Sequence, residues 1–187
     1  MSEARSLNGK VLIVDDNFDS VELMRQVLSE CGLEVRGLTD SREVLTEAID
    51  WLPDLILLDV RMPNMTGMEG CESLRTETVT DRIPIMFVTA EKKDVRVLSE
   101  AFRLGADDFI AKPISEEELV SRVGVHLRLK ATLDMLEEQN QKLQDISERD
   151  SMTMLLNHRS MVQRLEELCS QLRRYGNPQF AMAMIDI

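Results

Sequence analysis

The sequence is short of cysteine, histidine and long apolar runs, and each shortage excludes a class of protein. The cysteines, Cys31, Cys71 and Cys169, are odd in number and form no C-x-x-C pair, which favours reduced, structural thiols in a cytosolic protein. The histidines, His126 and His158, lie too far apart in the chain to indicate a zinc site. No apolar run is long enough to cross a bilayer, and residues 1–10 lack the apolar stretch of a secretory signal. We therefore expect a cytoplasmic protein that has no membrane partner.

Basic residues are also in short supply. The 187 residues include 22 basic and 34 acidic side chains, which gives a net charge of -12. Nucleic-acid phosphate repels such a chain unless it carries a local basic cluster, and we find none in the sequence. We therefore expect no nucleic-acid partner. The hydrophobic content of 43% and the charged content of 30% suit a globular protein slightly longer than one typical domain.

Short apolar runs alternate with helix-like stretches over residues 10–125. The runs cover residues 10–14, 33–38, 55–58, 83–88 and 107–111. The third run has no alternation of apolar and polar residues, which is typical of a strand buried on both faces. Helical spacing follows each run, with Asp19 or Ser20 as the expected cap of the first helix and a Ser115–Glu118 capping box in the last. Because parallel strands need helical crossovers, the pattern predicts an α/β domain with a doubly wound, five-stranded parallel sheet.

Polar side chains follow four of these runs, at the point where each predicted strand ends. Asp15 and Asp16 follow the first run, Asp59 the third, Thr89 the fourth and Lys112 the fifth. Ligands bind at the carboxyl edge of such sheets, where these side chains would meet. Adjacent carboxylates repel each other, and a bound divalent cation is the usual compensation. The sequence therefore predicts one acidic, cation-holding site with a hydroxyl and a lysine.

Each of these residues also has a purely structural interpretation. Asp59 and the Asp15-Asp16 pair could cap helices or lie in solvated loops. Thr89 could be a strand-end hydroxyl, and Lys112 could be a surface lysine paired with an aspartate. Four such side chains at the same edge of one sheet favour a joint site over separate structural roles.

The motifs around these residues resemble the receiver domain of two-component response regulators. They are VDD at 14–16, LLDVRMPNMTG at 57–67, VTA at 88–90 and FIAKP at 109–113. The resemblance covers residues 10–126 and implies a flavodoxin-like sheet with strand order 2-1-3-4-5. It also implies phosphorylation on an aspartate, with a sensor histidine kinase or phosphotransfer protein as the partner.

The resemblance assigns a role to each site residue. It makes Asp59 the phosphoacceptor, and it implies that Thr89 and Lys112 contact the phosphoryl oxygens. It also implies a Mg²⁺ cofactor, held directly by Asp16 and Asp59, through water by Asp15, and by the backbone carbonyl of Arg61. Phe109 matches the switch aromatic of the family, although an aromatic residue in a strand is also a common packing residue.

The last predicted helix continues far beyond the receiver pattern, over residues 115–147, which corresponds to a rod of about 50 Å. Leu119, His126, Leu133 and Asn140 fall seven residues apart, and Leu129, Leu136 and Leu143 fall three residues after members of that series. Leucine at one heptad position and a single asparagine at the other favour a parallel homodimer. The alternative is a single helix that folds back on its own domain.

Residues 149–187 resemble the start of diguanylate cyclase (GGDEF) domains. Asp150, Thr153, Leu155, Asn157 and Arg159 match the opening motif of those domains, and FAMAMIDI at 180–187 resembles their first strand. The GG(D/E)EF motif is absent, so we expect no enzyme activity from this chain and regard a longer parent protein as a candidate cyclase. Whether the chain is a truncated form or a degenerate remnant stays open.

The sequence thus predicts a receiver domain over 1–125, a coiled-coil linker over 126–148 and a partial GGDEF domain over 149–187. The expected function is that of a phosphorylated response regulator that controls a cyclase-type output through a dimeric helix. The alternative is an adaptor with a receiver fold that signals by protein–protein contact without phosphorylation. A DNA-binding regulator is disfavoured by the net charge and by the lack of a helix-turn-helix segment.

Overall fold

The computed structural model describes residues 7–90, 95–148, 150, 152–153 and 155–175, and the side chains of 95–98, 144–148 and 172–175 lie outside that description. Its strands are β1 (Lys10–Val14), β2 (Glu34–Leu38), β3 (Leu55–Asp59), β4 (Ile85–Thr89) and β5 (Asp108–Ala111). Its helices are α1 (Phe18–Glu30), the 3-10 turn η1 (Ser41–Glu43), α2 (Val44–Trp51), α3 (Gly67–Thr76), α4 (Val95–Arg103), α5 (Glu116–Glu148) and α6 (His158–Tyr175).

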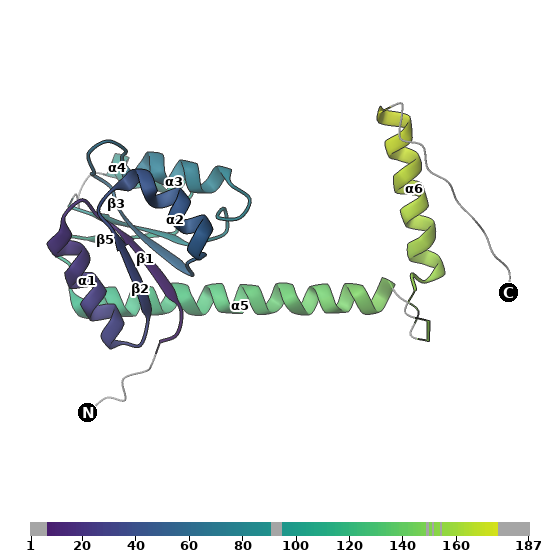
Figure 1. The fold of residues 1–187 in the computed structure, drawn as a ribbon, viewed down its shortest axis with the longest axis horizontal. Coiled ribbons are helices and arrows are strands. Elements are labelled where there is room, and N and C mark those ends of the chain that lie inside the picture. The colour runs from purple at the N-terminus through teal and green to yellow at the C-terminus, as the bar shows by residue number, and fades with distance from the viewer. Residues whose placement is uncertain (1–6, 91–94, 149, 151, 154, 176–187) are drawn as a thin grey trace. The chain divides into compact units, whose positions relative to one another are not determined.

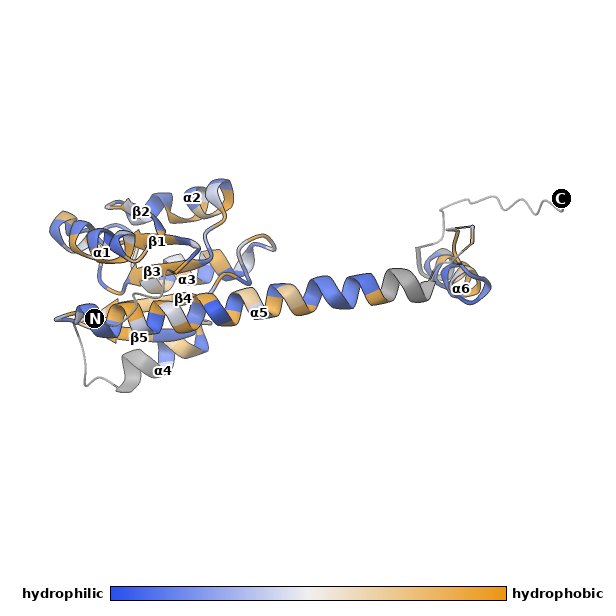
Figure 2. Ribbon diagram, turned by 90° about the horizontal axis from the view of Figure 1, so that it is seen from below, coloured by the Kyte–Doolittle hydropathy of each residue, from blue (hydrophilic) through white to orange (hydrophobic). Residues whose placement is uncertain are grey.

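The five strands form one parallel sheet in the order β2-β1-β3-β4-β5, as predicted (Figure 1). All five residues of β3 are buried, which agrees with the unalternating apolar run. Alternate residues of the strands face opposite sides, so each face has its own core. In Figure 2 strands such as β3 and β4 are coloured mostly as hydrophobic, whereas the helices carry hydrophobic and hydrophilic residues in alternation.

One core packs α2, α3 and α4 against the sheet, and the other packs α1 and α5 against its opposite face. Leu12, Leu58 and Phe87 belong to the first core, while Ile13 and Leu57 belong to the second. Helices on both faces bury the central strands β1, β3 and β4, whereas β2 at one side of the sheet stays largely exposed. This arrangement makes the carboxyl edge of the strands the place to look for a site.

The starts of two helices, α1 and α5, differ in detail from the expectation. Asn17, rather than Asp19 or Ser20, caps α1, and its side-chain oxygen accepts the Ser20 N–H at 3.0 Å. Ser115 does accept the N–H of Glu118, at 3.5 Å, but the Glu118 carboxylate pairs with Arg122 at 2.9 Å. The return half of that predicted capping box is replaced by a charge-assisted contact one turn further along, which is the stronger interaction.

Two compact units divide the chain, at residues 1–133 and 134–187, and helix α5 contributes to both. In the first unit, α5 buries Leu119, Val123 and Leu127 against the sheet. The expectation that Leu119 lies in a dimer seam is therefore wrong, because its side chain is only 1% exposed and fills the core of its own domain. Leu129, Leu133, Leu136 and Leu143 follow on the same helix and are each at least half exposed.

The second unit contains α6 and a short turn that precedes it. One carboxylate oxygen of Asp150 accepts the N–H of Met152 at 3.2 Å and both the N–H and the hydroxyl of Thr153 at 2.9 Å. Asn157 accepts the Ser160 N–H at 2.9 Å at the start of α6. The predicted strand at 180–187 lies outside the described residues. Within the part of the chain that the structure covers, none of the helices combines the length and the apolar character needed to span a bilayer.

Candidate functional site

A lysine bridges two buried carboxylates at the carboxyl edge of the sheet. The Nζ of Lys112 lies 2.7 Å from Oδ2 of Asp15 and 2.6 Å from Oδ1 of Asp59. The Asp15 and Asp59 side chains are 1% and 7% exposed, whereas that of Lys112 is 28% exposed. Carboxylates buried so deeply need a compensating charge, and the ammonium group supplies one positive charge for two negative ones.

The sheet topology brings these three residues together from distant parts of the sequence. Asp15 directly follows β1, Asp59 ends β3, and Lys112 directly follows β5. The parallel pairing places Val14 beside Leu58 and Thr89 beside Ala111, so the strand ends are in register. The backbone N–H of Lys112 also donates to the Thr89 carbonyl at 2.7 Å, which continues the β4–β5 pairing up to the site.

Backbone N–H groups hold the remaining carboxylate oxygens. The Asn17 N–H donates to Oδ1 of Asp15 at 2.9 Å, and the Arg61 N–H donates to Oδ2 of Asp59 at 2.7 Å. Each aspartate therefore has one oxygen fixed by the loop that follows its strand and one oxygen bound to Lys112. This leaves the Asp59 carboxylate in a single defined orientation at the edge of the sheet.

A glycine permits the close approach of the β3–α3 loop to Asp59. A Cβ on Gly67 would lie only 2.1 Å from the backbone carbonyl oxygen of Asp59. The Gly67 N–H donates to the carbonyl of Val60 at 3.1 Å, which closes the loop over the strand end. Thr66 and Glu69 then form a complete capping box at the start of α3, so the loop is fixed at both ends.

The electrostatics of the site reflect its burial. Burial raises the pKa of Asp59 above its ordinary value, the hydrogen bond and charge of Lys112 oppose this rise, and the neighbouring Asp15 charge adds to it. Burial also acts to lower the pKa of Lys112, but the hydrogen bonds to Asp15 and Asp59 outweigh it, so that the pKa is raised. Lys112 therefore remains a fixed positive charge at neutral pH. It lies next to Asp59, whose charged form is destabilised by burial.

The other predicted site residues surround this cluster. Thr89 is buried at the end of β4, and Asp16 is exposed directly after Asp15. Phe109 is half-buried in β5, packs against the core of the first face and meets Phe102 edge to face at 6.3 Å between ring centroids. The half-buried position fits both interpretations of Phe109, as a switch aromatic and as a packing residue, and those interpretations stay predictions.

The donor set of the site suits Mg²⁺, which prefers oxygen ligands. Asp15 and Asp59 place two buried carboxylates at one strand edge, and Asp16 adds a third in the next position of the chain. Among the described residues, however, no three carboxylate, imidazole or thiol groups are already gathered as a cation site. Lys112 lies within hydrogen-bond distance of both buried carboxylates and offsets one of their two negative charges.

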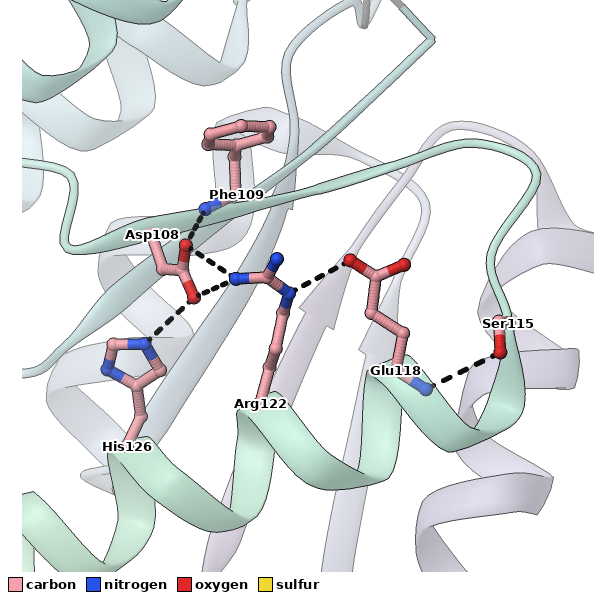
Figure 3. A network of polar contacts seen from close by, with 6 residues as sticks. All are labelled: Asp108, Phe109, Ser115, Glu118, Arg122 and His126. Atoms are coloured by element: carbon pink, nitrogen blue, oxygen red, sulfur yellow. Dashed lines mark hydrogen bonds and ion pairs between the residues drawn. The ribbon is translucent and has the colours of Figure 1, made fainter.

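A second polar cluster, which sequence reasoning missed, joins β5 to α5 (Figure 3). Arg122 Nη1 contacts both oxygens of Asp108, at 2.8 and 3.0 Å, and His126 Nε2 lies 3.2 Å from Oδ2 of the same carboxylate. The heptad spacing alone predicts His126 in a dimer seam, whereas the structure places it against a carboxylate of β5. The sequence signal for this cluster is the spacing of Glu118, Arg122 and His126, which lie four residues apart and so share one side of a helix.

The chain belongs to the response regulator receiver domain family, whose sequence pattern matches residues 11–124. It is 38% identical over 123 residues to the alkaline phosphatase synthesis transcriptional regulatory protein PhoP of Bacillus subtilis, a match that covers 65% of this chain and 50% of PhoP. The chain thus spans about half the length of such curated relatives, and the match does not extend to the other half of those proteins.

Solved structures agree on the fold. A response regulator from Chloroflexus aurantiacus is 34% identical, with a TM-score of 0.62, and the match covers 65% of this chain and 99% of that one. The receiver domain of the sensor histidine kinase PA1611 from Pseudomonas aeruginosa is 24% identical, with a TM-score of 0.60, over 65% of this chain and 98% of that one. That second structure has a magnesium ion coordinated in its active site cleft. At its level of identity the likeness establishes the shared fold alone.

Proposed function

We propose that this receiver domain is phosphorylated on Asp59 in a Mg²⁺-dependent reaction. The observation that carries the proposal is the Lys112 ammonium group, which contacts the buried carboxylates of both Asp15 and Asp59. Here two buried carboxylates share one lysine, and the exposed Asp16 follows directly, so the site keeps an excess of negative charge that suits a divalent cation.

The residues of the chain have distinct tasks in this proposal. The Arg61 N–H holds Oδ2 of Asp59, which leaves Oδ1, now bound to Lys112, as the oxygen that would attack the phosphorus of a donor. As the new O–P bond forms, the bond between phosphorus and the donor would break, and its electron pair would leave with the donor, a kinase histidine or, in the test, acetate. Lys112 then neutralises charge on the transferred group, and the hydroxyl of Thr89 at the end of β4 contacts a phosphoryl oxygen. Phosphoryl transfer depends mainly on such positioning and charge neutralisation.

Mg²⁺ would be held by Asp16 and Asp59 directly, by Asp15 through water and by the carbonyl of Arg61. When bound, the ion supplies neutralisation of the equatorial phosphoryl oxygens. The phosphodonor partner would be a sensor histidine kinase or a phosphotransfer protein, in the cytoplasm. The PA1611 receiver domain, with its coordinated magnesium ion, supports the same kind of cofactor here.

The test is phosphorylation by acetyl phosphate, followed by intact mass measurement. We expect the wild-type chain to gain one phosphoryl group in the presence of Mg²⁺ and none after chelation. Asp59→Asn should abolish the gain, and Asp54→Asn serves as a matched control because Asp54 lies at the opposite edge of the sheet, where it accepts the Lys10 N–H at 2.8 Å. Equal phosphorylation of the Asp59→Asn variant would refute the assignment. If the wild type takes up no phosphoryl group, the adaptor alternative replaces the proposal.

The output is proposed to pass through helix α5 to a cyclase-type domain. Leu129, Leu133, Leu136 and Leu143 form an exposed apolar stripe on this helix, and Asn140 interrupts it at heptad spacing. Two parallel copies would bury these leucines and let the asparagines bond each other in register. Charges on the helix mostly avoid the stripe, as the Glu138–Lys142 ion pair at 2.6 Å illustrates, since both residues occupy outer heptad positions.

The cyclase-type output rests on the motif match at 150–159, and PhoP shows that a similar receiver can instead belong to a transcriptional regulatory protein. We propose that this chain is not itself a cyclase, because it carries no GG(D/E)EF motif. Analytical ultracentrifugation tests the dimer: we expect association at micromolar concentration that tightens with Asn140→Leu. A wild-type chain that stays monomeric with and without beryllofluoride would contradict the dimeric helix.

A further inference from the structure

The loop that connects β3 to α3, at residues 60–66, contains a residue in a conformation that most side chains disfavour. Asn64 has a φ of 72°, in the left-handed region that favours glycine. On either side of it, Met62 and Met65 pack their side chains against the first core. Apolar packing has no preferred direction, so it does not by itself fix the path of the backbone between these residues. The loop therefore benefits from a directional contact that comes from another part of the chain.

The side chain of Ser41 makes such a contact, from 22 residues earlier in the chain. Its hydroxyl donates to the carbonyl of Pro63 at 3.3 Å, and the Met65 N–H donates to the same oxygen at 2.9 Å. Ser41 is only 2% exposed. Because water cannot easily replace a lost partner at such a buried position, breaking the contact would leave the hydroxyl unsatisfied.

Ser41 is itself held in place at the start of η1. Asp40 caps this turn: its carboxylate accepts the Arg42 N–H at 3.0 Å, and its carbonyl accepts the Glu43 N–H at 3.2 Å. The Arg42 side chain also pairs with the Asp40 carboxylate, at 2.6 Å. The hydroxyl of Ser41 therefore reaches the loop from a fixed support.

The loop leads from this contact to the candidate site. Pro63 lies two residues after Arg61, whose N–H donates to Oδ2 of Asp59 at 2.7 Å and whose carbonyl is the proposed backbone ligand of Mg²⁺. The Gly67 N–H closes the loop by donating to the Val60 carbonyl at 3.1 Å. The two ends of the loop are thus fixed, and the contact at Pro63 holds its middle. Mg²⁺ tolerates little departure from octahedral geometry, so a small displacement of a ligand weakens its binding.

We propose that Ser41 is a positioning residue for the Mg²⁺ site, because its hydroxyl holds Pro63 and thereby sets the position of the Arg61 carbonyl. This inference rests on the proposed function, and it names a residue outside the four motifs that predict the site. The effect is indirect, since the hydroxyl contacts a residue two positions away from the proposed ligand. By linkage, a contact that helps Mg²⁺ to bind is in turn stabilised when Mg²⁺ is bound.

Titration of the full chain with Mg²⁺ alone, followed by backbone amide chemical shifts, tests the proposal. Ser41→Ala removes the hydroxyl and leaves the site carboxylates intact. We expect the Mg²⁺ affinity to fall about tenfold, as it does when a group that holds a metal ligand is removed. Phosphorylation by acetyl phosphate should be slower at low Mg²⁺ and should reach the wild-type rate at saturating Mg²⁺. A positioning role predicts this split between affinity and limiting rate, since the phosphoacceptor is unchanged.

Hydrogen exchange provides a second measurement that does not depend on phosphorylation. Without Mg²⁺, Ser41→Ala should lose protection over residues 60–66, where the Met65 N–H shares the Pro63 carbonyl, while β1 and β3 stay protected. In the wild type, Mg²⁺ should slow exchange over residues 41–45 as well as in the loop. The variant should lose the effect over 41–45, because the contact that joins the two segments is absent.

Two further variants guard the interpretation. Thr80→Val is the matched control, because Thr80 also buries its hydroxyl fully and donates it to a carbonyl, that of Leu74, at 2.7 Å in the segment between α3 and β4. It should lower stability and leave the Mg²⁺ affinity unchanged. Ser41→Cys keeps a side chain of similar size with a much weaker donor, so it should also weaken Mg²⁺ binding and keeps the test open if Ser41→Ala does not fold.

The outcomes separate this inference from the proposed function. If the wild type neither binds Mg²⁺ nor accepts a phosphoryl group, the proposed function fails, and the role of Ser41 fails with it. If the wild type does both and the Ser41 variants bind Mg²⁺ as tightly as the wild type, only the role of Ser41 is wrong. An equal loss of Mg²⁺ affinity in Thr80→Val would also overturn it, because the loss would then follow from lower stability in general.

Discussion

The two edges of the sheet each hold a partly buried cation, and the two cations make opposite kinds of contact. At the edge where the strands begin, Arg75 donates to the carbonyls of Asp81, Ile83 and Gly105 at 2.7–3.0 Å and pairs with Asp107 at 2.9 Å. At the edge where the strands end, Lys112 is shared by two buried carboxylates. Arg75 is fully supplied with partners, whereas the charges around Lys112 do not balance.

The balance of charge around each cation distinguishes a structural cation from a functional one within this domain. Arg75 ties the end of α3 to the segments that enter β4 and β5, and one carboxylate matches its one charge. The cluster around Lys112 carries one more negative charge than positive, counting only Lys112, Asp15 and Asp59. Unbalanced charge lowers stability unless a ligand restores the balance, so it marks the site that a ligand is meant to fill.

Removing Arg75 should have the largest effect on stability. Arg75→Ala leaves three carbonyls and a carboxylate without their partner, and we expect a loss of about 3 kcal/mol in the free energy of unfolding. Urea denaturation measures the loss. Arg25→Ala is the matched control, because Arg25 pairs with Glu22 on the exposed side of α1, and it should leave the free energy of unfolding almost unchanged. Equal losses for both variants would show that Arg75 is not a structural clamp.

Magnesium should have the next largest effect, and only at the other edge. A ligand at ten times its dissociation constant stabilises the folded state by about 1.4 kcal/mol. We expect Mg²⁺ to raise the melting temperature of the wild type and of Asp107→Asn, and to leave Asp59→Asn almost unchanged. Differential scanning calorimetry across a Mg²⁺ titration provides the measurement. A similar rise in Asp59→Asn would place the cation elsewhere in the protein.

The same substitution at the two edges should change stability in opposite directions. Asp107 accepts the Ile85 N–H at 2.8 Å and pairs with Arg75, so Asp107→Asn should lower the free energy of unfolding by about 1 kcal/mol. Asp59→Asn removes one of two carboxylates that share a lysine, so in the absence of Mg²⁺ it should raise that free energy by about 1 kcal/mol. Chemical denaturation in a chelating buffer compares the two. A loss of stability in both variants would show that the two edges of the sheet do not differ in charge balance.

The smallest effect is a pH dependence that belongs to Asp59. Its folded pKa lies above the ordinary value of 3.8, chiefly because of burial, so the folded state binds the proton more tightly than the unfolded chain. The contribution of Asp59 to stability is therefore complete below pH 3.8 and is lost as the pH rises through the folded pKa. The stability advantage of Asp59→Asn over the wild type should grow over that interval and then level off. A difference between the two proteins that is constant from pH 4 to pH 7 would contradict the raised pKa.

Much of this fold could be predicted from local sequence. The apolar runs at 10–14 and 55–58 identified buried parallel strands, because only a strand covered on both faces lacks alternation. The motifs at their ends identified Asp15, Asp59 and Lys112 as one site, and the structure brings these three into contact. The metal ligands and the role of Phe109 stay predictions, since they depend on a bound ion and on a second conformation.

Helix α5 shows what local sequence could not decide. The seven-residue spacing placed Leu119, His126 and Leu133 on one line, yet the structure buries Leu119 in the core, pairs His126 with Asp108 and leaves Leu133 exposed. The helical period predicts which residues share one face of a helix. Only the packing of the helix against the sheet determines which part of that face is buried. The partner of His126 comes from β5, 18 residues earlier, and no pattern within the helix specifies it.

The sequence alone predicts the order of strands and helices along the chain, the burial of the third strand on both faces and the residues at the carboxyl edge of the sheet. These follow from apolar periodicity and from side chains that cannot remain unpaired in a core. The packing of the layers sets the remaining contacts: Lys112 with Asp15 and Asp59, Arg75 with the segments at the opposite edge, and Asp108 with α5. Each of these contacts brings groups from different elements to within about 3 Å of each other. Sequence spacing cannot predict distances of that precision, because they depend on how the packed layers fit together.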